Sequence, residues 1–237
     1  MLSRLATLVL LAASLRGCVA YEYDHEFWLR VDGSGSVNVT GRPELWIAFK
    51  GLGIRPDAPD DTMRAAARSL FESSGLRVRR ATVTRRSGRR YLFLAADFTD
   101  VNRLAGTPAF RDLHLGLSLE GDRLLLGGTW LLPATVSRSE APRDGLMAVR
   151  FHLPSRIYEH KNAPLGVERG NIVGWREDVA EGLDGHPLEI GATMDSRSIL
   201  GSTVALFATA ILAALALLAA AIALVLRRGK TRAGASP

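Results

Sequence analysis

The sequence predicts an α+β fold, in which antiparallel sheet packs against one or two helices and a single transmembrane helix follows. Three observations support this prediction. Apolar and polar residues alternate through several segments, another segment has helical spacing, and a long uncharged segment lies near the C-terminus. The chain has 237 residues, of which 47% are apolar and 23% are charged, so it can bury a core. Because both ends are targeting or membrane segments, we expect one compact domain between them.

Residues 1–17 are expected to form a signal peptide. Leu5–Ala13 is almost wholly apolar and follows Arg4. A run this short is typical of the apolar centre of a signal peptide and does not span a bilayer. The sequence therefore predicts that the domain is exported.

A single cysteine stands at the expected cleavage site. Leu15, Gly17 and Cys18 match the −3, −1 and +1 positions of a bacterial lipobox, whose cysteine receives diacylglycerol, although Arg16 departs from that pattern. Cys18 is the only cysteine, so it has no partner for an internal disulfide. The alternative is ordinary cleavage after Ala20, which would remove the thiol. We favour lipidation of Cys18.

The domain is expected to begin with a hairpin and a helix. Polar and apolar residues alternate through Tyr21–Thr40 on both sides of the turn Asp32–Gly35, as in two half-buried strands. Asp60 or Asp61 is expected to cap a helix that covers the core and ends at Gly75.

The rest of the domain is expected to be mostly strand. Asp100 can cap a short helix that starts at Val101 and stops near Gly106, and the small and polar residues of Pro133–Pro142 indicate a loop. Alternation predicts further strands in these segments: Leu76–Arg86 and Arg89–Phe98 around Ser87-Gly88, Leu113–Glu120 and Arg123–Trp130 around Gly121-Asp122, Met147–Leu153, Ile172–Trp175, and Leu188–Ala192.

The C-terminal part is predicted to cross the membrane once. Residues 204–226 carry no charge, and at about 1.5 Å per residue a helix of that length reaches roughly 34 Å, more than a hydrocarbon core of about 30 Å. Four basic residues follow at once in the tail, residues 227–237. By the positive-inside rule the tail is cytoplasmic, so residues 18–200 form an extracytoplasmic domain on a bacterial cell membrane.

The charge distribution argues against nucleic-acid binding. The net charge of +6 comes from two basic residues in the leader and four in the tail. Between these ends, 24 basic residues balance 24 acidic ones. The exported domain is therefore formally neutral.

No arrangement of residues indicates catalysis or a metal site. The chain lacks a Gly-x-Ser-x-Gly motif, and Glu177-Asp178 is expected to lie in a loop. No two histidines have the i, i+4 spacing of a helical zinc site: they are His25, His114, His152, His160 and His186. We expect a non-enzymatic protein without cofactor or metal.

The sharpest local feature is a group of arginines around one predicted hairpin turn. Seven occur within fourteen residues: Arg77, Arg79, Arg80, Arg85, Arg86, Arg89 and Arg90. Guanidinium groups bind phosphate bidentately and stay charged, so the group is a candidate site for anionic lipid headgroups. The alternative is that these arginines keep the turn soluble and protect an edge strand.

The order of these features resembles the LppM-type bacterial lipoproteins. The residues that carry the resemblance are Cys18, Val31–Ser36, Phe151–Ser155, Asn162 and Gly170–Trp175, with Ser155 where the family pattern has glycine. The resemblance covers nearly the whole chain and implies an envelope protein with a compact αβ domain that binds lipids or glycolipids. It transfers no catalytic residue.

Two classes of function remain. The first is an ectodomain that binds lipid or glycolipid, which needs an apolar cavity between sheet and helices. The second is a structural or assembly partner of another, unidentified envelope protein, which needs an exposed apolar patch or a membrane helix that makes contacts. The membrane itself is the only partner that the sequence specifies.

We predict that Cys18 becomes the lipidated N-terminal residue, because it has lipobox spacing and is the only thiol. Intact-mass measurement of the membrane-extracted protein tests this, and the expected mass is that of residues 18–237 plus the acyl groups. A mature chain that starts at Tyr21 without acyl mass would contradict the prediction.

Overall fold

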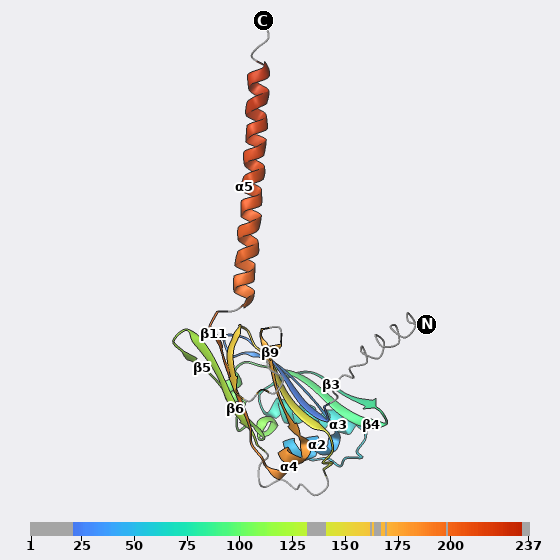
Figure 1. The fold of residues 1–237 in the computed structure, drawn as a ribbon. Coiled ribbons are helices and arrows are strands. Elements are labelled where there is room, and N and C mark those ends of the chain that lie inside the picture. The colour runs from blue at the N-terminus through green and yellow to red at the C-terminus, as the bar shows by residue number, and fades with distance from the viewer. Residues whose placement is uncertain are drawn as a thin grey trace, which may run out of the picture.

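The computed structural model describes residues 21–131, 141–161, 163, 167–168, 170–197 and 199–233. They form an α+β domain with two sheets, from which one long helix projects (Figure 1). The strands are β1 (Tyr23–Leu29), β2 (Gly35–Gly41), β3 (Arg77–Arg86), β4 (Arg89–Phe98), β5 (Leu113–Glu120), β6 (Arg123–Trp130), β7 (Leu146–His152), β8 (Ile157–Lys161), β9 (Val167–Glu168), β10 (Ile172–Asp178) and β11 (Leu188–Asp195). The α-helices are α2 (Pro43–Lys50), α3 (Asp60–Ser73), α4 (Val179–Asp184) and α5 (Ile199–Ala233), and the 3-10 turns are η1 (Val101–Arg103) and η2 (Pro108–Phe110).

The larger sheet has seven strands in the order β3-β4-β2-β1-β7-β10-β9. Its pairs are antiparallel as expected, except that β1 and β7 run parallel, with Tyr23 opposite Met147. More than a hundred residues separate these two strands, so the chain has ample length for the crossover that parallel neighbours need. The smaller sheet is wholly antiparallel, in the order β5-β6-β11-β8.

The hairpins expected from alternation and turn residues are present. β1 pairs with β2, β3 with β4, and β5 with β6. At the β3–β4 turn, Ser87 and Gly88 both have positive φ, 48° and 77°, which is the backbone conformation of a tight two-residue hairpin turn. Asp100 accepts a hydrogen bond from the backbone N–H of Asn102, so it caps η1 as predicted.

Several short elements were not expected from the sequence. Helix α2 begins with Pro43 and ends before Gly51, whose φ of 66° is the left-handed conformation that closes many helices. The strands β8 and β9 and the helix α4 are also additional to the predicted elements. Glu177-Asp178 ends β10 and does not lie in a loop.

The expected cap of α3 is wrong. Pro59 occupies the N-cap position, and no side chain caps the helix. Asp60 is the first helical residue, and its carboxylate instead pairs with Arg90 at 3.2 Å. The acidic residues of the first turn still interact favourably with the positive, N-terminal end of the helix dipole.

Aromatic side chains fill the space between the sheets and helices. Tyr23 stacks on Phe49 of α2 with ring centroids 4.9 Å apart, and Phe27 stacks on Phe151 at the same separation. Trp130 of the smaller sheet lies 5.6 Å from both Tyr23 and Phe49. These five side chains are buried and join the two sheets and α2 into one core.

One ion pair is buried within this core. Lys50, the last residue of α2, donates to Asp112 at 2.7 Å, and both side chains are fully buried. The second carboxylate oxygen of Asp112 accepts a hydrogen bond from the indole of Trp130 at 3.1 Å, and its backbone carbonyl accepts from Leu131 at 2.8 Å. Burial lowers the pKa of Lys50, and the charge of Asp112 opposes that shift. Asp112 therefore ties α2 to the end of β6.

Helix α5 leaves the domain after β11 (Figure 1). Its segment Thr203–Ala223 contains 21 residues and is long and apolar enough to cross a membrane. None of that segment is buried against the described part of the domain. The position agrees with the span expected at residues 204–226, and its orientation across the membrane remains a prediction.

We predict that Asp112→Asn destabilises the domain by about 3–5 kcal/mol, because it leaves the charge of Lys50 buried without a counter-ion. Urea unfolding of the detergent-solubilised chain, followed by tryptophan fluorescence, measures the change. The double variant Lys50→Met, Asp112→Asn removes the buried charge and should regain part of the loss. The exposed pair of Arg55 and Asp57 provides the control, since Asp57→Asn should change stability by less than about 0.5 kcal/mol. Equal losses for Asp112→Asn and Asp57→Asn would refute the prediction.

Candidate functional site

The seven clustered arginines do not form one site. They lie on the edge strand β3 and its neighbour β4, and a ten-residue strand extends for roughly 33 Å. At one end of these strands, Arg77 and Arg79 both pair with Asp97, at 2.6 and 3.0 Å. Arg89 and Arg90 lie at the other end, beside the hairpin turn.

Of the remaining three arginines, Arg85 and Arg86 lie opposite Arg90 and Arg89 beside the same turn, and Arg80 lies nearer the other end of the hairpin. Arg80 lies over the ring of Phe93 and Arg86 over the ring of Tyr91, at 5.9 and 5.1 Å from the ring centroids. Arg85 is exposed and makes no ion pair with the described residues. These contacts fit the alternative reading, that part of the group keeps an edge strand soluble.

Arg90 connects the hairpin to the loop before α3. Its guanidinium donates to the carbonyls of Pro56 and Ala58, at 2.5 and 2.8 Å, and to the carboxylate of Asp60 at 3.2 Å. The side chain is three-quarters buried, so these contacts hold the loop against β4. Sequence reasoning placed Arg90 in a lipid site, and the structure shows that most of its donors are already used.

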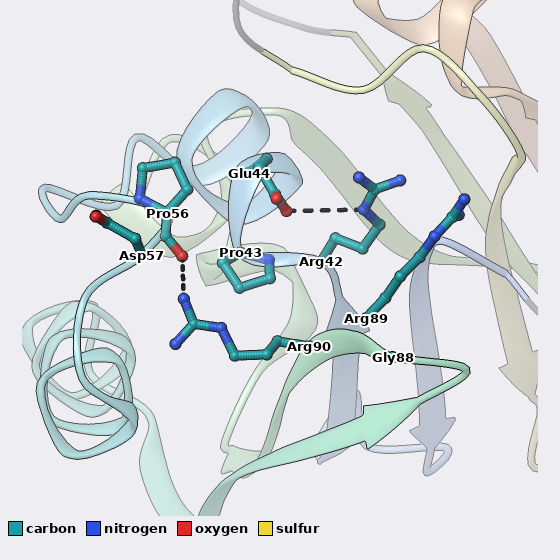
Figure 2. A pocket seen from close by; sticks show the side chains of 8 residues that line it. All are labelled: Arg42, Pro43, Glu44, Pro56, Asp57, Gly88, Arg89 and Arg90. Atoms are coloured by element: carbon teal, nitrogen blue, oxygen red, sulfur yellow. Dashed lines mark hydrogen bonds and ion pairs between the residues drawn. The ribbon is translucent and has the colours of Figure 1, made fainter.

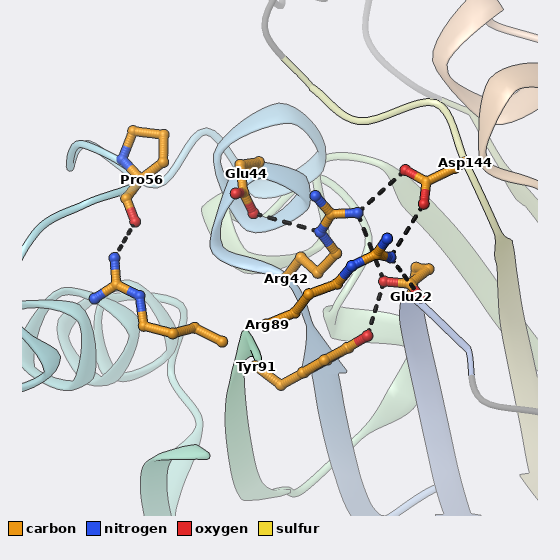
Figure 3. A network of polar contacts seen from close by, with 8 residues as sticks. Glu22, Arg42, Glu44, Pro56, Arg89, Tyr91 and Asp144 are labelled. Atoms are coloured by element: carbon orange, nitrogen blue, oxygen red, sulfur yellow. Dashed lines mark hydrogen bonds and ion pairs between the residues drawn. The ribbon is translucent and has the colours of Figure 1, made fainter. Parts of the chain in front are cut away.

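Arg42 and Arg89 share two carboxylates (Figure 3). Asp144 accepts from both guanidinium groups, at 3.2 and 3.1 Å. Glu22 lies 3.8 Å from Arg42 and 3.6 Å from Arg89, and it accepts a hydrogen bond from the hydroxyl of Tyr91 at 2.8 Å. The hydrogen bond with Asp144 raises the pKa of Arg89.

A hollow of about 320 Å³ opens between the β3–β4 turn and the start of α2 (Figure 2). We call it the arginine hollow; it is lined by Arg42, Pro43, Glu44, Pro56, Asp57, Gly88, Arg89 and Arg90. The lining carries three guanidinium groups and two carboxylates, and Glu22, Asp60 and Asp144 pair with these arginines from outside the lining. Such a hollow can accept an anionic group of the size of a phosphate, with guanidinium groups as donors.

A second hollow of about 200 Å³ adjoins the first. It shares Glu44 and Pro56 with the arginine hollow, and the side chains of Ile47, Ala48 and Ile54 supply an apolar lining. We call it the apolar hollow. The two together place a surface of paired arginines and carboxylates beside an apolar one.

Sequence reasoning found Arg89 and Arg90 but missed the other members of this site. Glu22, Arg42 and Asp144 come from separate parts of the chain, and folding brings them together. The only local indication was the position of Arg42 directly before Pro43, where an unrecognised helix begins.

Other expected sites fall outside the structure or do not assemble. Cys18, the signal peptide at residues 1–17, Asn162, most of the Pro133–Pro142 loop and the end of the tail lie outside the described residues. Within the described part of the chain, no three His, Cys, Asp or Glu side chains are grouped so as to hold a metal ion.

Two polar side chains are buried beside the core ion pair. His25 is fully buried, and among the described residues neither ring nitrogen has a hydrogen-bond partner; the same holds for the hydroxyl of Tyr23. The His25 ring packs against Trp130 and Tyr23, with centroids 4.9 and 5.1 Å apart. Burial, and then the charge of Lys50, lower the pKa of His25 well below its usual value. The residue is a neutral part of the core.

Comparisons with known proteins show one similar structure. No protein-family model matches the chain, and no curated protein matches it. The NMR structure of the folded domain of LppM from Mycobacterium tuberculosis aligns with a TM-score of 0.40 and 14% identity, over 75% of this chain and 92% of that chain. This overlap is too weak to assign the chain to a family, so the resemblance to the LppM-type lipoproteins remains a prediction.

We predict that the domain loses stability as the pH falls from 7 to 5, and that His25 contributes to the loss. The unfolded chain binds a proton at His25 near pH 6.5, whereas the folded chain does so only at lower pH. The contribution of His25 to the free energy of unfolding is therefore fully present above pH 6.5 and is lost as the pH falls below 6.5. Urea unfolding at several pH values should show a smaller decrease for His25→Leu than for the natural chain.

The exposed His114 on β5 supplies the control for this measurement. His114→Gln should keep the pH dependence of the natural chain. The same slope in the His25→Leu and His114→Gln variants would show that His25 does not contribute.

Proposed function

We propose that this chain is a non-enzymatic, membrane-anchored protein of the bacterial cell envelope whose exported domain binds the anionic headgroup of a lipid or glycolipid. The observation that carries the proposal is the arginine hollow with the apolar hollow beside it. A phosphate-bearing headgroup is the chemistry that guanidinium donors recognise, and the apolar hollow suits the adjoining part of an amphiphile.

The packed interior favours a binding site on the surface. Buried aromatic rings occupy the region between sheets and helices where an internal lipid cavity would lie. The ligand therefore binds at the edge of the domain, with its headgroup between the β3–β4 turn and α2. Any longer acyl chain would stay in the membrane.

The electrostatics of the site set a limit on affinity. Asp144 and Glu22 already pair with Arg42 and Arg89, so a phosphate competes with these carboxylates. Arg89 is half exposed and has free donor directions, whereas Arg42 is mostly buried. We expect weak, salt-sensitive binding in which Arg89 makes the main contact.

The alternative is a structural or assembly role in the envelope. One observation favours it: the candidate span in α5 is not buried against the described part of the domain, so another membrane helix can pack on it. That role needs no arginine hollow, and the two functions give different results in the experiment below.

The test measures binding of dihexanoyl phosphatidylglycerol to the full chain in phosphatidylcholine nanodiscs. We expect low-affinity binding that weakens as salt increases, no comparable binding of dihexanoyl phosphatidylcholine, and weaker binding of glycerol phosphate, which lacks the apolar part. Arg89→Gln removes one arginine contact of about 1 kcal/mol, so we expect this variant to bind the lipid roughly fivefold more weakly.

Arg77→Gln is the matched control, because Arg77 is a more exposed arginine at the opposite end of the same hairpin. It should bind like the natural chain. No binding of the anionic lipid, or equal losses in both variants, would reject the arginine hollow as the site and leave the assembly role.

A further inference from the structure

Large apolar side chains are exposed at the end of the domain from which α5 leaves. They are Leu119, Tyr158 and Val31, with 63%, 48% and 40% of their surfaces exposed. We call these three residues the membrane-proximal tip. Among the other described domain residues, Leu131 is similarly exposed, but it follows the far end of β6.

Hydrogen bonds connect the tip to the chain just before α5. Leu119 lies beside the β5–β6 turn, where the carbonyl of Asp122 accepts from the backbone N–H of Ser196 at 3.1 Å. Tyr158 donates its hydroxyl to Asp195, the last residue of β11, at 3.1 Å. The tip is therefore attached to the residues that lead into the helix.

The β1–β2 turn joins the same end. The carbonyl of Gly33 accepts from the backbone N–H of Val101 at 2.9 Å, and Gly33 lies beside the side chain of Leu117 in β5. This places the turn that carries Val31 next to the end of β5. In Figure 1 the ends of β5 and β11 lie beside the start of α5, and the β3–β4 hairpin lies on the other side of the domain.

The chain length keeps the tip close to the bilayer. The candidate span begins at Thr203, and the four helical residues from Ile199 rise by about 6 Å, comparable with a headgroup layer of roughly 5–8 Å. Three further residues back to Ser196 add at most about 11 Å, even when fully extended. The β5–β6 turn thus lies within about 17 Å of the hydrocarbon, measured along the chain.

The chemistry of the tip fits the interface of a bilayer. Tyr158 combines an apolar ring with a polar hydroxyl, and the guanidinium of Arg123 lies 5.1 Å over the ring. Tyrosine and arginine are both suited to the headgroup level, where the apolar part of the side chain is buried and the polar end is hydrated. Exposed arginines and carboxylates are mixed at this end: Arg30, Asp32, Glu120, Asp122, Arg123, Arg156 and Arg197. Contact with a membrane here therefore does not depend on anionic lipid.

We infer that the membrane-proximal tip rests in the interfacial layer of the same bilayer that α5 spans, with Leu119 inserted among the lipids. The occupant of this exposed apolar surface is the lipid surface itself, because the span holds the two together. The inference depends on the span and not on ligand binding in the arginine hollow.

The test uses the full chain with Cys18→Ser, so that α5 is the only anchor, in nanodiscs of zwitterionic phosphatidylcholine. An environment-sensitive fluorophore is attached at Leu119→Cys or, in a separate sample, at Tyr158→Cys. Thr62→Cys is the matched control, because Thr62 is exposed in the first turn of α3, beside the Asp60–Arg90 pair at the opposite end. Quenching is measured with nitroxide-labelled lipid and with aqueous iodide.

We expect both tip probes to show blue-shifted emission, several times stronger quenching by the lipid nitroxide than the Thr62 probe, and weaker quenching by iodide. Equal quenching by iodide at all three positions would overturn the inference. Protection of the tip probes from both quenchers would also overturn it, because a second copy or another protein would then cover the tip.

Discussion

The fold depends on one buried ion pair, between Lys50 and Asp112. Lys50 ends α2, Asp112 precedes β5, and Trp130 at the end of β6 completes the group, so a single carboxylate joins a helix to two strands of the smaller sheet. A charge buried at this position is costly unless it is paired, and the pairing therefore fixes how α2 sits against the sheet. Because α2 also forms one wall of both surface hollows, the geometry of the candidate site follows from this interaction.

The same packing decides where a ligand can bind. Aromatic rings from β1, α2, β6 and β7 fill the space between the two sheets and α2, so a ligand has no room there. Polar chemistry is therefore found at the edges of the domain, where guanidinium and carboxylate groups keep access to water. His25 and the Lys50–Asp112 pair are exceptions within the core, and His25 is held there in its neutral form.

Sequence patterns predicted the regular parts of the fold and only part of the site. Alternation and turn residues identified the three hairpins because both signals are local. The helix α2 was missed because eight residues show little periodicity, and the β1–β7 pair was missed because parallel pairing leaves no local signal. Likewise, the closeness of seven arginines in the sequence suggested a single site, but the length of an extended strand separates Arg77 from Arg89. The other members of the site, Arg42, Glu22 and Asp144, come from distant parts of the chain and meet only after folding.

The chain enters the domain at one end of its strands and leaves at the other. Glu22 lies beside Arg89 at the hairpin turn, only four residues after Cys18, while Asp195 and α5 lie at the opposite end. With Cys18 acylated and α5 in the same bilayer, a short tether at each end would hold the domain on its side, with its strands along the membrane plane. In that posture the arginine hollow and the membrane-proximal tip would both lie close to the bilayer, and release of either tether would free the domain to pivot.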